Sequence, residues 1–178
     1  MALLIAPEAA RLLARYGAWQ NASLLAAADA LGEAAREADR GAFFGSIRAT
    51  FSHLLWADRM WMARLAGWPR PEGGIAESAR HETDWARLRA ARSEADARIR
   101  AWAEGLSEAD LAGDLAWWSG AAGREVRKPK ALLVLHLFNH ATHHRGQIHA
   151  MLTAAGARPG DTDLFLIPDI PTPEASAP

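Results

Sequence analysis

Apolar residues recur along this chain at intervals of three and four positions in four long stretches, which polar or glycine-rich segments separate. Such spacing places the apolar side chains on one face of an α-helix. The pattern predicts helices near residues 7–31, 42–66, 82–104 and 129–155. Pro7 and Pro129 suit the first positions of two of these helices, and Gly156 suits the end of the last one.

The connections between the predicted helices also carry information about the fold. Residues 67–74 are rich in Gly and Pro and form the strongest helix breaker in the chain. Residues 33–40 have the composition of a polar connection, and residues 111–128 contain two short extended pieces around a turn. The sequence therefore predicts an all-α protein, a four-helix bundle with long connections and a possible short hairpin before the last helix.

Length and composition favour one folded unit. The chain has 178 residues, of which 50% are hydrophobic and 23% charged, as in an ordinary globular domain with a sizeable core. No internal repeat or linker divides it. We expect residues 1–168 to form one domain and residues 169–178 to be a Pro-rich mobile tail.

The net charge and the residue types argue against several classes of partner. The net charge is −1, so bulk electrostatics gives no reason to expect a nucleic acid or a membrane surface as partner. The chain has no cysteine, so any soft-metal site must use His, Asp or Glu. The N-terminus lacks the features of a signal peptide, and no apolar run approaches the roughly 20 residues of a membrane span. We expect a cytoplasmic protein.

Four histidines lie within nine residues of the last predicted helix: His136, His140, His143 and His144. Because an α-helix advances about 100° per residue, His140 and His144 would lie one above the other on the same face. With this spacing one helix can offer two imidazoles to a single metal ion. His143 adjoins His144 and is therefore poorly placed to share the same ion.

His53 is the candidate third ligand. It lies within the otherwise apolar predicted helix 42–66, where a single histidine is usually a core residue that is hydrogen-bonded to a neighbour. Facing helices of a bundle can also assemble metal sites from inward-pointing side chains. His53, His140 and His144 would then form a three-imidazole site with coordination positions open for water or substrate. The spacing alone leaves both interpretations open.

Three stretches of the chain resemble the DinB family of metal-binding four-helix bundles. They are Tyr-Gly-Ala-Trp-Gln-Asn at 16–21, the segment 41–59 around His53, and Asn-His-Ala-Thr-His-His-Arg-Gly-Gln at 139–147. The likeness covers roughly residues 7–167. It implies that His53, His140 and His144 hold one divalent metal ion (Zn, Ni, Fe or Mn), and that the protein is a homodimer. Members of the wider superfamily include transferases and an isomerase that use low-molecular-weight thiols.

Two classes of function remain open at this stage. The first is a metal-dependent enzyme, a thiol-dependent transferase or a hydrolase, acting on a small molecule with or without a low-molecular-weight thiol. Three neutral imidazoles would leave the charge of the ion uncompensated, which favours ionising a bound water or thiol. The second is a non-catalytic metal-binding or stress-response bundle in which the ion is structural.

Residues near the predicted ligands can be given provisional roles. His136 and Gln147 lie close to the ligand stripe, either as hydrogen-bond partners of the ligands or as packed core residues. Asp58 and Arg59 are open to two interpretations, a surface pair or residues with a functional role. Arg145 points away from the ligands, and we expect it to form an ion pair between helices or subunits.

Overall fold

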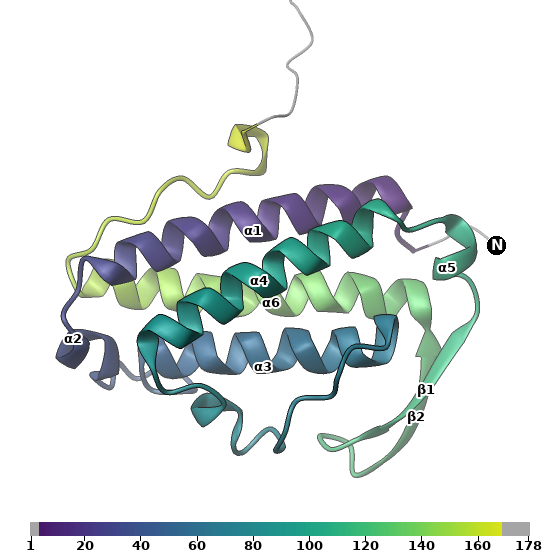
Figure 1. The fold of residues 1–178 in the computed structure, drawn as a ribbon, viewed down its shortest axis with the longest axis horizontal. Coiled ribbons are helices and arrows are strands. Elements are labelled where there is room, and N and C mark those ends of the chain that lie inside the picture. Colours follow the sequence, from purple (N-terminus) through teal and green to yellow (C-terminus); the bar gives the residue numbers. More distant parts are fainter. Residues whose placement is uncertain (1–3, 169–178) are drawn as a thin grey trace, which may run out of the picture.

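The computed structural model describes residues 4–168, and within this part of the chain the structure is mostly helical. Four long helices run side by side (Figure 1). They are α1 (Pro7–Asp29), α3 (Ile47–Ala66), α4 (Trp85–Glu104) and α6 (Lys130–Ala154). Helix α1 packs against α4 and α6, and α3 packs against the same two helices. The predicted all-α class is confirmed in its main part, with a small sheet added.

Short elements complete the described chain: α2 (Glu33–Glu37), the 3-10 turns η1 (Ser78–Arg80) and η2 (Leu164–Leu166), α5 (Glu108–Leu111), and the strands β1 (Asp114–Ser119) and β2 (Arg124–Pro129). The two strands pair antiparallel, with Asp114 opposite Pro129 and Ser119 opposite Arg124. The predicted hairpin before the last helix is therefore confirmed. The predicted tail, 169–178, lies outside the described residues.

The start of α3 was predicted incorrectly. The apolar pattern placed it at Ala42, but the helix begins at Ile47. Gly41 and Gly45 adopt φ of 74° and 76°, a conformation that only glycine takes up readily, and Ala42 pairs with Gly45 in an isolated bridge. The apolar residues before Ile47 therefore belong to a tight turn. Residues 33–40, predicted as a polar connection, contain the short helix α2.

The core consists mainly of apolar side chains from all four long helices. Fully buried examples are Leu24, Phe51, Leu54, Leu88, Leu137 and Ile148. Removing this surface from water is the main source of stability for helices of this kind. No helix in the described part of the chain is long and apolar enough to cross a membrane.

A group of charged side chains is also buried. Arg92 on α4 is fully buried, and its guanidinium donates to Asp58 on α3 at 2.7 Å and to Asp96 at 2.8 Å. Asn21 on α1 donates to the same Asp96 at 2.9 Å. Of the two interpretations of Asp58 and Arg59, the surface pair is wrong, because Asp58 is only 4% exposed and pairs with a residue on another helix.

Ser46 caps the N-terminus of α3. Its hydroxyl oxygen accepts a hydrogen bond from the backbone N–H of Ala49 at 3.1 Å. We expect Ser46→Ala to lower the free energy of unfolding by about 1 kcal/mol, since one N–H of the first turn loses its partner. Urea denaturation followed by circular dichroism measures this change.

Ser93→Ala is the matched control, because Ser93 is exposed in the interior of α4. It should alter the free energy of unfolding by no more than about 0.5 kcal/mol, in the stabilising direction that alanine favours within helices. Equal destabilisation by the two substitutions would contradict the capping role of Ser46.

Candidate metal centre

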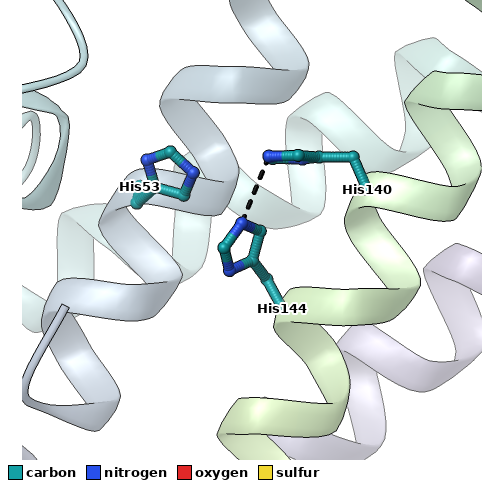
Figure 2. Close-up of side chains that lie close together, drawn as sticks. All are labelled: His53, His140 and His144. Carbon is teal, nitrogen blue, oxygen red and sulfur yellow. Dashed lines mark hydrogen bonds between the residues drawn. The ribbon is translucent and has the colours of Figure 1, made fainter. Parts of the chain in front are cut away.

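Three histidines from two helices converge between α3 and α6. Figure 2 shows His53 on α3 facing His140 and His144 on α6. Each imidazole offers one nitrogen, and the three nitrogens lie within 4.8 Å of one another. The Nε2 atoms of His140 and His144 are 3.1 Å apart. The structure thus brings together the three residues that the sequence singled out.

The three imidazoles lie in a setting that keeps them neutral. His53 and His144 are 5% and 6% exposed, and His140 is half-buried. Burial, helped by the neighbouring His144 and His140, lowers the pKa of His53 to about 3. Burial likewise lowers the pKa of His140 to about 4 and lowers that of His144. Neutral imidazole is the form that binds metals, so no proton needs to be removed from the group at pH 7.

A hydrogen bond to Ser78 determines which nitrogen of His53 carries the proton. The Ser78 hydroxyl donates its one hydrogen to the carbonyl of Ile75 at 2.6 Å. It lies 2.7 Å from Nδ1 of His53, and toward that atom it can only accept. His53 Nδ1 therefore carries the hydrogen, and its Nε2 presents a lone pair.

The loop that carries Ser78 is itself held against α3. The Ser52 hydroxyl donates to the carbonyl of Ser78 at 3.1 Å and accepts from the backbone N–H of Glu82 at 3.0 Å. The indole N–H of Trp56 donates to the carbonyl of Glu72 at 3.0 Å. Sequence reasoning missed Ser78 because this loop has no periodicity that would reveal which helix it contacts.

Gln147 plays the corresponding part for His144. Its side-chain carbonyl Oε1 lies 2.8 Å from Nδ1 of His144 and can only accept a hydrogen bond. His144 is therefore protonated at Nδ1, with the lone pair at Nε2. The sequence left Gln147 open between a partner of the ligands and a core residue, and the structure shows the contact with His144.

The protonated nitrogen of His140 can be deduced from that of His144. The 3.1 Å contact between the Nε2 atoms of His140 and His144 needs one hydrogen, and His144 has none at that atom. His140 therefore donates from Nε2. Its Nδ1 is buried without a hydrogen-bond partner among the described residues, and it holds a lone pair. A ligand role for His140 Nε2 would move this hydrogen to Nδ1.

Aromatic rings cover the histidine cluster. Phe44 stacks on His53 with ring centroids 3.9 Å apart and lies 5.6 Å from the ring of His144. Trp56 lies 6.2 Å from His53 on the same helix. These rings lower the local polarity, which strengthens electrostatic interactions at the site. The sequence pattern had placed Phe44 in a helix and gave no sign of this contact.

The remaining histidines of α6 lie beside the cluster. The ring of His136 is 5.6 Å from that of His140 and 4.9 Å from that of Trp61. His143 is exposed and outside the group of candidate ligands. Within residues 4–168 no carboxylate joins the three histidines, so at least one position around a central ion would be free of protein ligands.

Arg145 does not form the ion pair that its position suggested. Within the described residues no carboxylate oxygen lies within 4 Å of its guanidinium. Its Nη2 donates to the hydroxyl of Thr142 at 2.9 Å, and its guanidinium carbon lies 5.6 Å from the ring centroid of Tyr16 on α1. The side chain thus contacts α1 rather than the three-histidine cluster.

These features describe a helical protein with a buried three-histidine cluster that is compatible with metal binding. The chain matches the DinB family over residues 7–174, nearly its whole length, and it belongs to that family. Comparison with curated proteins and with solved structures found no match.

The hydrogen-bond pattern predicts the protonated nitrogen of each imidazole. In the metal-free protein at pH 7, His53 and His144 should carry hydrogen on Nδ1 and His140 on Nε2. Two-bond ¹H–¹⁵N correlation spectra distinguish the two forms of neutral imidazole. Finding His53 or His144 protonated at Nε2 would contradict the roles given to Ser78 and Gln147. Gln147→Leu should release the preference of His144, and with it that of His140, while His53 keeps its hydrogen on Nδ1.

Proposed function

We propose that the protein binds one divalent metal ion through Nε2 of His53, His140 and His144, and that the metal-bound protein is an enzyme. In this proposal the four long helices serve as the four-helix bundle of the DinB family and present the ligands. The strongest support comes from the orientation of His53 and His144, whose Nε2 lone pairs are held toward a common point. No fourth protein ligand joins them and His140 in the described chain.

The separation of the candidate ligand atoms supports the proposal. Zinc–imidazole bonds of about 2.0–2.1 Å in a tetrahedral site place neighbouring nitrogens about 3.3 Å apart. The Nε2 atoms of His140 and His144 are 3.1 Å apart. His53, within 4.8 Å of both, needs only a small side-chain adjustment to complete the set. Zn, Ni, Fe and Mn all accept imidazole, so the ligand types do not single out one of them.

A bound divalent ion would supply Lewis acidity, which generates a nucleophile at neutral pH from water or a thiol. Side chains around the histidines would orient the ligand rings and exclude water. Ser78 and Gln147 accept the Nδ1 hydrogens of their histidines and so fix the orientation of each ring. Phe44 excludes water from one side of His53. The position that no protein ligand fills would be open to that water or thiol, the nucleophile for a small electrophilic substrate.

The burial of the cluster favours a second candidate function. His53 and His144 are nearly inaccessible, and Phe44 lies over them. A metal site that is so poorly accessible to solvent would suit an ion that stabilises the bundle without performing a reaction. The two candidates share the metal site and differ in whether the loaded protein turns over a substrate.

Metal content tests the site itself. We expect about one divalent ion per chain in untagged protein loaded with Zn, and a sharp fall in occupancy for His53→Ala and His144→Ala. Helical content should change little, because apolar packing supplies most of the stability. Inductively coupled plasma spectrometry and circular dichroism measure the two quantities.

His143→Ala is the matched control for these variants, since His143 adjoins His144 but is exposed and outside the cluster. It should retain the metal content of the unmodified protein. An unchanged metal content in His53→Ala and His144→Ala would show that the three histidines are not the ligands.

Turnover distinguishes the enzyme from the structural alternative. The metal-loaded protein should accelerate transfer of a low-molecular-weight thiol to an activated aryl halide, or hydrolysis of an activated ester, with the activity lost after chelation and in His140→Ala. Full metal occupancy that raises the melting temperature, without turnover of either substrate type, would favour the structural role. The predicted homodimer is checked separately, by sedimentation velocity at micromolar concentration.

A further inference from the structure

A cavity lies on a different flank of α6 from the histidine cluster. It has a volume of about 350 Å³ and is bounded by α1, α6 and the segment that follows α6. Its lining includes Tyr16 and Leu24 from α1, and Thr142, Arg145, His149 and Ala150 from α6. The volume falls within the range of small-molecule sites. None of the three candidate metal ligands lines this cavity.

Arg145 is the charged group of this cavity, and its bonding is incomplete. The side chain is 6% exposed, and within the described residues its only hydrogen bond is the one that Nη2 donates to Thr142. A guanidinium has five N–H donors and remains cationic at pH 7. Most of the donor capacity of Arg145 is therefore unused, although burial of a charge normally requires partners.

The buried carboxylates nearby are bonded to Arg92 and do not touch Arg145, although Oδ1 of Asp58 has no hydrogen-bond partner among the described residues. Asp58 and Asp96, whose charges act on Arg145, are bonded to Arg92 at 2.7 Å and 2.8 Å. Neither lies within 4 Å of Arg145. An anion that entered the cavity would supply the direct partner that the described chain does not provide.

The rest of the lining indicates what kind of anion fits. The Tyr16 hydroxyl donates to the carbonyl of Thr162 at 2.6 Å, and the Gln20 amide donates to the carbonyl of Asp161 at 2.8 Å. These two side chains thus hold the segment after α6 at the rim of the cavity. Leu24, Ala150 and the ring of Tyr16 add apolar surface beside the guanidinium. A guanidinium can donate two parallel hydrogen bonds to a carboxylate. Next to apolar walls, it therefore suits an organic carboxylate that also has an apolar part.

We propose that this cavity is a second ligand site, which binds a small organic carboxylate through Arg145 and packs its apolar part against Tyr16 and Leu24. Arg145 follows His144 directly on α6. One helix would therefore carry the candidate metal ligands on one flank and a carboxylate-binding guanidinium on another.

The chain offers an unambiguous probe, because Tyr16 is its only tyrosine. Protein containing ¹³C-labelled tyrosine gives one set of ring signals, all of which report on this cavity. Benzoate is the test ligand, and benzamide is the control with the same ring and no charge. We expect benzoate to shift the Tyr16 signals saturably in the millimolar range, and benzamide to bind at least tenfold more weakly.

Each other result would overturn the proposal. An absent or non-saturating response to benzoate would exclude the site, and equal affinity for benzamide would exclude the role of Arg145 as the charge partner. Inorganic phosphate binding as tightly as benzoate would overturn the assignment to an organic carboxylate.

Two leucine substitutions on α6 locate the binding. Ala150 lines the cavity, whereas Ala154 is exposed one turn further along the same helix and outside the lining. Ala150→Leu should fill part of the cavity and weaken benzoate binding at least tenfold, while Ala154→Leu should leave it unchanged. Equal affinities in the two variants would place the benzoate elsewhere and overturn the proposal. Because the site does not involve the three histidines, the experiment is independent of metal content.

Discussion

The buried guanidinium of Arg92 constrains how the helices of this protein can pack. Its two bonds join α4 to α3 through Asp58, and the bond of Asn21 to Asp96 adds α1. Apolar side chains can slide past one another at modest cost, but a buried charge that loses a partner costs about 3–5 kcal/mol. Only one register of the three helices satisfies all of these groups together. That register also sets the height at which the second turn of α3, which carries His53, faces α6.

Helix α6 has to serve three environments at once. Leu137, Ala141 and Ile148 face the apolar core, His140 and His144 face α3, and Arg145 faces α1. Because α6 contacts other parts of the protein on three sides, it has no clear polar face. Its sequence consequently shows a weak amphipathic pattern, although the helix is the longest in the described chain.

The sequence predicted the parts of this structure that depend on local regularity. The four long helices follow from apolar periodicity and from Gly and Pro at their ends, and the pairing of His140 with His144 follows from helical geometry. His53 was identified as a polar residue in an apolar stretch, supported by the family resemblance. The sequence could not reveal contacts between distant segments. The role of Asp58 stayed open in the sequence because its partner, Arg92, lies 34 positions away.

The turn before α3 shows the same limit. Ala42 and Phe44 continue the apolar pattern of the helix, and only the left-handed conformations of Gly41 and Gly45 separate them from it. Phe44 thereby reaches His53 from a loop. Likewise, the position of Ser78 beside His53 depends on the bonds that Ser52 and Trp56 make with the loop, and no local spacing records them.

The candidate ligands stand on helices that are held together mainly by apolar side chains, and this has a consequence for how an ion would be chosen. A cluster that is assembled by the apolar core, with its imidazoles already oriented, does not reshape itself around each ion. Affinities of such nitrogen sites for divalent metals follow the Irving–Williams order, whatever the protein. The occupant in a living cell would then reflect the free concentrations that metal homeostasis maintains, and a change in those concentrations could exchange one ion for another without unfolding the chain.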